Sequence, residues 1–211
     1  MQHFPLEETS FLLAGPVGDL EVLATPAPVD NTKNITVVIC HPHPLFGGTM
    51  TNKVVSTLAR AFRNLGLQSI RFNFRGVGKS AGHFDDGRGE AQDLSVVIDW
   101  VKQTRPQDTL WLAGFSFGGY IAAKVASQDE TVQQLVSVAP QVSRFLQDKF
   151  VVSASWIIVQ GDKDEVVSPT EVFAWVETLT PQPTLIKIEG AGHFFHGKLI
   201  ELRERLELSL S

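Results

Sequence analysis

Short apolar runs alternate with amphipathic helical segments along most of this chain, and this alternation is the feature that most constrains its fold. Strands are predicted over Ile35–Cys40, Gln68–Phe74, Thr109–Ala113, Leu135–Ala139, Trp156–Gln160 and Thr184–Glu189. Helices are predicted over Lys53–Leu65, Glu90–Lys102, Tyr120–Ser127, Thr170–Leu179 and Gly197–Leu210. The run at Ile35–Cys40 is bounded by turn residues, which is typical of strands that are buried on both faces. Strands that alternate with helices predict an α/β layered fold with a mostly parallel sheet.

Two segments fall outside this alternation. Phe11–Leu13 and Asp19–Ala24, separated by Gly15–Gly18, predict a β-hairpin. Pro140–Ser155 has no clear element, although a helical turn is expected at Arg144–Phe150, and it is too short to form a separate lid. No repeat or composition shift marks a second unit. We therefore expect residues 1–211 to form a single domain with roughly eight strands, helices on both faces of the sheet and no cap domain.

Composition excludes several functional classes. The formal net charge of −5 and the pI near 5.7 argue against a nucleic-acid-binding surface. A single cysteine, Cys40, cannot form an internal disulfide, which fits a reducing compartment. The N-terminus lacks the features of a signal peptide, and no apolar run reaches the roughly 18 residues of a membrane span. A cytoplasmic protein with no nucleic-acid or membrane partner is expected, whereas the oligomeric state is left open.

The segment Gly114-Phe-Ser-Phe-Gly-Gly119 lies between a predicted strand and a predicted helix. A serine at such a sharp turn is strained, and glycines two residues to either side relieve the crowding. The frame is that of a nucleophile elbow, which lifts the hydroxyl of Ser116 clear of the sheet.

Two partners for this serine are predicted at the ends of later strands. His193 follows the last strand on a loop of small residues and is the candidate base, because a serine hydroxyl needs a base to become nucleophilic. Gly161-Asp-Lys-Asp-Glu165 offers the acid that orients the imidazole. Asp164 is favoured by the pattern Gly-x-x-Asp-x-x-Val, and Asp162 remains the alternative. The order Ser, Asp, His matches the triad of proteins with a nucleophile elbow.

Five motifs carry a resemblance to a known family. They are Cys40–Gly48, Arg75–Ser80, Gly114–Gly119, Gly161–Asp164 and Gly192-His193. Together they resemble the α/β-hydrolase superfamily, and more narrowly its small lidless bacterial members, which are serine esterase-like or dienelactone-hydrolase-like. The resemblance covers the chain from Ile35 to the C-terminus and implies a serine hydrolase.

An acyl-transfer site also needs backbone amides that bind the oxyanion. Phe117, the residue after the nucleophile, is one expected donor. The second must come from the loop after Cys40, where the prolines lack an N–H group. His43, Leu45 and Phe46 remain possible donors, and we favour His43 from its position after the strand.

The walls of the site are expected to be apolar side chains near these motifs. The candidates are Phe46, Met50, Phe145 and Phe194, with Phe115, Phe117 and Phe195 in addition. An open site of this kind predicts a preference for acyl groups of roughly two to six carbons, since each exposed methylene forgoes up to about 0.8 kcal/mol.

The predicted function is hydrolysis of a small ester or thioester through an acyl-enzyme on Ser116, with no cofactor and no metal. The alternation of His41 and His43 could indicate a metal site, but no third ligand has a recognisable spacing. Two other functions stay open: a peptidase or amidase that uses the same triad, and a ligand-binding scaffold without catalysis.

Overall fold

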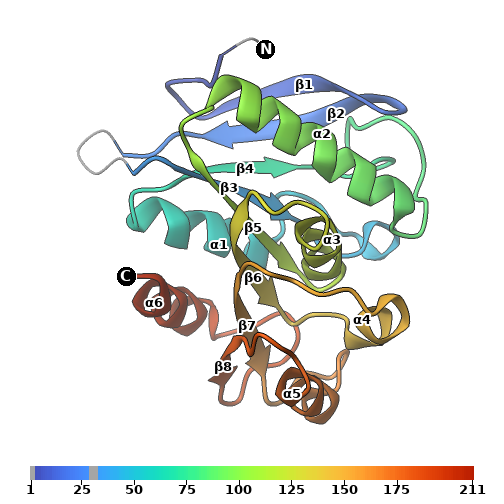
Figure 1. The fold of residues 1–211 in the computed structure, drawn as a ribbon, viewed down its shortest axis with the longest axis vertical. Helices are drawn as coiled ribbons and strands as arrows, with labels where there is room; N and C mark the ends of the chain where they lie inside the picture. Colours follow the sequence, from blue (N-terminus) through green and yellow to red (C-terminus); the bar gives the residue numbers. More distant parts are fainter. Residues whose placement is uncertain (1–2, 29–32) are drawn as a thin grey trace.

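The computed structural model describes residues 3–28 and 33–211, and these residues form an eight-stranded sheet with helices on both sides (Figure 1). The strands are β1 (Thr9–Gly15), β2 (Gly18–Thr25), β3 (Ile35–Cys40), β4 (Gln68–Phe72), β5 (Thr109–Phe115), β6 (Val132–Val138), β7 (Ser155–Gly161) and β8 (Thr184–Ile188). The helices are α1 (Lys53–Asn64), α2 (Arg88–Thr104), α3 (Phe117–Ala126), α4 (Val142–Asp148), α5 (Pro169–Glu177) and α6 (Leu199–Leu210).

The sheet has the order β1-β2-β4-β3-β5-β6-β7-β8. The predicted hairpin is present, with β1 antiparallel to β2 and β2 antiparallel to β4, while every pair from β4 to β8 is parallel. The apolar run of β3 lies near the centre of the sheet, where Val37 to Cys40 are fully buried. Burial on both faces is what the continuous apolar pattern of this strand predicts.

The helices divide between the two faces of the sheet. Helices α1 and α6 share one apolar cluster with the sheet, and α2, α3, α4 and α5 share the other (Figure 1). In α1 the buried residues include Val54, Leu58 and Phe62, which lie on one stripe of the helix. The side chain of Asn52 accepts hydrogen bonds from the amides of Val54 and Val55, which caps this helix. The helices are therefore held by burial of one face each.

Some element boundaries differ from the prediction. Strand β4 ends at Phe72. The amide of Asn73 still donates to Glu21 of β2, but the amide of Phe74 leaves the sheet and donates to the ring of His41. Strand β5 continues past Ala113 to Phe115 because its last residues pair with β6.

The segment between β6 and β7 contains one short helix, α4, and no cap domain. Helix α4 covers Val142–Asp148, two residues earlier than the helical turn predicted at Arg144–Phe150. None of the helices in residues 3–28 and 33–211 is long and apolar enough to cross a membrane.

Candidate active site

Ser116 lies at the turn between β5 and α3, near the carboxyl end of the central strands. Its backbone has φ 54° and ψ −117°, a conformation that L-residues rarely adopt and that costs about 1–3 kcal/mol. Its amide donates to the carbonyl of Val138 at 2.8 Å, which fixes the turn against the neighbouring strand β6. The sequence motif therefore folds into the predicted sharp turn.

The glycines around Ser116 are required by contact between main chains. A Cβ atom at Gly114 would lie 2.2 Å from the carbonyl oxygen of Gly118. A Cβ atom at Gly118 would lie 2.4 Å from the carbonyl oxygens of both Cys40 and His41. These distances are far below van der Waals contact, so both positions need a residue without a side chain.

Three side chains from different loops meet at this turn. The Oγ of Ser116 lies 3.2 Å from Nε2 of His193, and Nδ1 of His193 lies 2.8 Å from Oδ2 of Asp164. Asp164 follows β7, and His193 follows β8. The carboxyl ends of parallel strands meet at one edge of a sheet, and this brings together residues that are far apart in the sequence.

The three acids after β7 have separate hydrogen-bond partners. Asp164 contacts the imidazole of His193, whereas Oδ1 of Asp162 accepts from the amide of Gly190 at 2.7 Å. Glu165 accepts from the backbone amide of His193 at 3.1 Å. Asp162 and Glu165 thus hold the loop that carries the histidine, and Asp164 alone of the three reaches its ring.

The pKa of the Asp164 carboxyl lies below its usual value. Burial raises this pKa, but hydrogen bonds from His193 and from the amides of Val167 and Val166 outweigh the effect of burial. Asp164 is therefore ionised at neutral pH. An ionised carboxylate accepts the Nδ1–H of His193 and leaves Nε2 free to take the proton of Ser116.

The backbone amides of Phe117 and His43, both near Ser116, have no acceptor among the residues that the structure describes. Phe117 is the first residue of α3, and His43 lies in the loop after β3. The other two amides that the sequence left possible are occupied, because Leu45 donates to Nδ1 of His43 and Phe46 donates to its carbonyl oxygen. Phe117 and His43 are the residues that the sequence favoured as oxyanion donors.

The loop that carries His43 is anchored by a buried histidine. The ring of His41 donates from Nδ1 to the carbonyl of Pro42 at 2.6 Å, and its Nε2 accepts from the amide of Phe74 at 3.0 Å. Burial lowers the pKa of His41 to about 4, although the hydrogen bond to Pro42 acts in the opposite direction. Both ring nitrogens are occupied, so His41 does not join His43 in a metal site.

An apolar cavity of about 430 Å³ opens beside Ser116 and His193. Two of the predicted wall residues, Phe46 and Phe194, line it and are 85% and 42% exposed. Val166 also lines it, although no motif singled this residue out. Its position after β7, at the edge of the sheet that carries the site, is the signal that could have identified it.

The predictions that Met50 and Phe145 line the substrate site are wrong. Both are 5% exposed, and neither lines a cavity that contains Ser116. Phe145 packs instead between the rings of Tyr120 and Trp175, at 5.6 and 4.7 Å. An aromatic residue near a motif can face either the core or the cavity, and here the two neighbouring rings decide the choice.

The remaining phenylalanines near the motifs are also buried. Phe115, Phe117 and Phe195 are fully buried, and Phe115 packs against the ring of His193 at 5.0 Å. Phe115 thus supports the histidine from the sheet layer and does not form a wall of the cavity.

The fold and this arrangement of serine, histidine and acid are those of a lidless α/β hydrolase. A model of the family described as serine aminopeptidase, S33, matches residues 32–157. The chain is 36% identical over 203 residues to an uncharacterized protein of Rickettsia prowazekii, a match that covers 91% of this chain and 84% of that one. The chain therefore belongs to the serine aminopeptidase S33 family of α/β hydrolases.

Two solved structures are similar over nearly the whole chain. A structure from Coxiella burnetii, described as an alpha-beta serine hydrolase homologue, is 51% identical with a TM-score of 0.94, and the match covers 99% of this chain and 100% of that chain. A structure from Xanthomonas campestris, described as a member of the α/β serine hydrolases without lid, is 48% identical with a TM-score of 0.94, and the match covers 97% and 94%.

Proposed function

We propose that this protein hydrolyses small esters or thioesters through a covalent acyl-enzyme on Ser116. The observation that carries the proposal is the chain of contacts from Oγ of Ser116 through the ring of His193 to Asp164, at 3.2 and 2.8 Å. A serine, a base and an orienting acid within hydrogen-bond reach form the arrangement that acyl transfer requires.

In the first step, Oγ of Ser116 attacks the carbonyl carbon while Nε2 of His193 takes the hydroxyl proton. The carbonyl π electrons move to the oxygen, which the amides of Phe117 and His43 stabilise. Loss of one such donor typically costs about 10²–10³ in kcat. The carbon–oxygen or carbon–sulfur bond then breaks, and His193 returns the proton to the departing alcohol or thiol. Water repeats the sequence and releases the acid.

The ionised Asp164 contributes to both steps. Its negative charge holds the Nδ1 proton of His193 and stabilises the imidazolium that forms during each attack. Apart from the attacking water, every group in these steps is a side chain or an amide of this chain. The cytoplasmic location that the sequence favours, and the absence of a nucleic-acid or membrane partner, stay predictions.

The test is hydrolysis of p-nitrophenyl acetate and p-nitrophenyl butanoate by the purified protein. Ser116→Ala should reduce turnover to the background rate, whereas Ser95→Ala, a change on the exposed side of α2, should retain it. Turnover that survives in Ser116→Ala would contradict the proposal.

Hydrolysis of amides is the second candidate, because the description of the matching family names an aminopeptidase. Aminoacyl p-nitroanilides, assayed beside the esters, separate the two functions. Cleavage of the anilides at rates comparable to the esters would favour a peptidase. Binding without turnover of either class would favour a non-catalytic protein.

A further inference from the structure

Two cavities open at Ser116, and His193 lines only one of them. The larger is the apolar cavity of about 430 Å³, and the second, of about 180 Å³, we call the smaller cavity. Ser116 and His43 line both, as do Phe46 and Val166. His193 lines the apolar cavity and is not among the residues that line the smaller one. The proposed nucleophile and one proposed oxyanion donor therefore lie where the two cavities meet.

The position of His193 decides which part of an ester lies in which cavity. In the tetrahedral intermediate, the carbon atom carries Oγ of Ser116, the oxyanion, the leaving group and the acyl chain. The leaving group receives its proton from Nε2 of His193, so its oxygen or sulfur must lie within reach of that nitrogen. Because His193 lines only the apolar cavity, the leaving group extends into that cavity. The smaller cavity is then left for the acyl chain.

The apolar cavity is lined by two exposed phenylalanines. All 14 phenylalanines lie in the described part of the chain, and Phe46 and Phe194 are the two that are exposed. Both line this cavity. The ring of Phe194 packs edge-to-face against His193 at 5.1 Å, and the ring of Phe46 lies 4.7 Å from that of His43. Exposed aromatic rings beside a reacting group gain most from contact with a bulky apolar ligand.

The smaller cavity differs from the apolar cavity in size and in the elements around it. Val142 and Ser143 of α4 line it, together with Ser168 and Glu171 at the start of α5. A cavity of about 150 Å³ holds one benzene ring. The smaller cavity, of about 180 Å³, therefore suits an acyl group of about one ring or less, whereas the apolar cavity, of about 430 Å³, has room for a group of about two rings.

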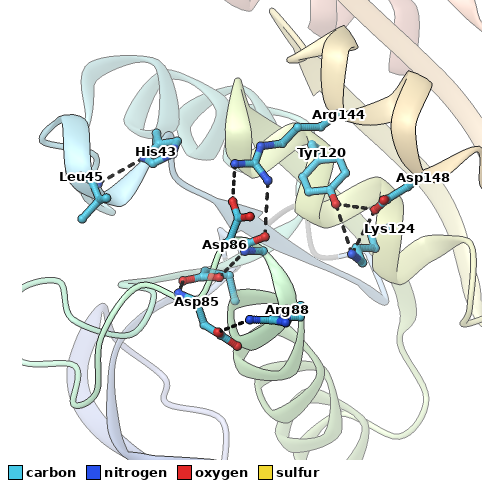
Figure 2. Close-up of polar contacts among 11 residues, drawn as sticks. His43, Leu45, Asp85, Asp86, Arg88, Tyr120, Lys124, Arg144 and Asp148 are labelled. Atoms are coloured by element: carbon cyan, nitrogen blue, oxygen red, sulfur yellow. Dashed lines mark hydrogen bonds and ion pairs between the residues drawn. The ribbon is translucent and has the colours of Figure 1, made fainter.

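Contacts at both ends of α4 keep the smaller cavity small. Arg144 donates to Oδ1 of Asp86 at 2.7 Å (Figure 2). At the other end of the helix, Asp148 accepts hydrogen bonds from Tyr120 and Lys124 (Figure 2). An outward movement of α4 would enlarge the cavity, and these contacts oppose it.

From these observations we infer that the substrates join a small acyl group, no larger than about one ring, to a bulky apolar alcohol or thiol. Phe194 is the specificity-determining residue for the leaving group, because it lines the apolar cavity and not the smaller one. The inference rests on the proposed function, since it takes Ser116 as the nucleophile and His193 as the proton donor. It adds what hydrolysis alone does not impose, namely a difference in size between the two halves of the ester.

The test compares two isomeric esters, 2-(1-naphthyl)ethyl acetate and ethyl 1-naphthylacetate. They contain the same atoms, but the naphthyl group belongs to the leaving group in the first ester and to the acyl group in the second. Each kcat/KM is divided by the rate constant of hydroxide-catalysed hydrolysis, which removes the difference in intrinsic reactivity. We expect the native protein to prefer the acetate by at least about tenfold, a factor that even one misplaced methylene can produce in an apolar pocket.

Variants on each cavity separate the two halves of the ester, with ethyl acetate as the common reference because a general loss of activity lowers all esters alike. Phe194→Ala should lower the value for naphthylethyl acetate relative to ethyl acetate and leave the ratio of ethyl butanoate to ethyl acetate unchanged. Ser143→Leu adds bulk beside the smaller cavity and should do the reverse. The matched control is Leu208→Ala, an exposed position on α6 that lines neither cavity, and both ratios should equal those of the native protein.

Equal values for the two naphthyl esters, or a preference for ethyl 1-naphthylacetate, would overturn the inference. A Phe194→Ala variant that keeps the native preference would overturn the role of Phe194. If Ser116-dependent hydrolysis of ethyl acetate persists in either case, the proposed function still stands. If no ester shows Ser116-dependent turnover, both the proposed function and this inference fail.

Discussion

Acidification should destabilise this protein through His41, the buried histidine that anchors the loop beside Ser116. The pKa of His41 lies at about 4, below the model-peptide value of 6.5. Its Nδ1 donates to Pro42 and its Nε2 accepts from Phe74. A second proton on the ring would remove the acceptor that Phe74 uses, and it would place a charge where no water reaches.

The size of the effect follows from the difference between these pKa values. Between pH 6.5 and pH 4 the unfolded chain binds a proton at His41 and the folded chain does not, so the free energy of unfolding falls as the pH falls. The contribution of His41 is fully present above pH 6.5 and is lost by about pH 4. A difference of 2.5 units corresponds to about 3 kcal/mol.

The assay is urea denaturation followed by tryptophan fluorescence at several pH values between 7.5 and 4. The matched variant is His41→Gln, which can still accept a hydrogen bond but does not titrate in this range. From pH 7.5 to 4, the native protein should lose about 3 kcal/mol more than the variant. Taking the difference cancels the groups that titrate alike in both proteins. Equal losses in the two proteins would refute the reasoning.

Three further changes have expected outcomes. Gly118→Ala should lower the free energy of unfolding by about 3 kcal/mol or more, because its Cβ would overlap two carbonyl oxygens. Gly197→Ala has open space around its Cβ and should lower the free energy of unfolding by about 1–2 kcal/mol, through its positive φ alone. Thermal denaturation measures both. Asp164→Asn should reduce kcat by about 10⁴-fold, and Asp162→Asn should reduce it by less than about tenfold. Equal losses in the two variants would contradict the assignment of Asp164 as the acid that orients His193. Arg144 of α4 donates to Oδ1 of Asp86 at 2.7 Å. Arg144→Gln should lower kcat/KM by about tenfold, because α4 carries Val142 and Ser143, which line a cavity beside Ser116, and an unchanged value would show that this ion pair does not position α4.

Much of the fold could be predicted because its strands are buried on both faces. The apolar run Ile35–Cys40 coincides with β3. A short, continuous apolar run between turn residues is typical of a strand that is buried on both faces, as a central strand is. The ends of strands are harder to predict from sequence where tertiary contacts determine them. Phe74 looks like a continuation of β4, yet its amide donates to His41, a residue that is distant in the sequence.

The close approach of the three candidate side chains was also predictable, because their positions follow from strand order. Ser116, Asp164 and His193 each follow a parallel strand, and the carboxyl ends of such strands lie at one edge of the sheet. The backbone strain at Ser116 requires the glycines around it, so the motif is visible in the sequence.

The walls of the site were harder to predict. Phe145 and Phe46 are both aromatic residues near the site, but Phe145 packs between other rings and the side chain of Phe46 is exposed to solvent. Val166 belongs to no motif, yet it lines the apolar cavity beside Ser116.

Covalent labelling of Ser116 tests the central claim most directly. The folded protein is treated with a fluorophosphonate probe, digested and analysed by mass spectrometry. The account predicts one adduct, on the peptide that contains Ser116, and its absence in Ser116→Ala and in protein unfolded with urea before treatment. A folded protein that remains unlabelled, or that carries the adduct on another serine, would contradict the claim that Ser116 is the activated nucleophile.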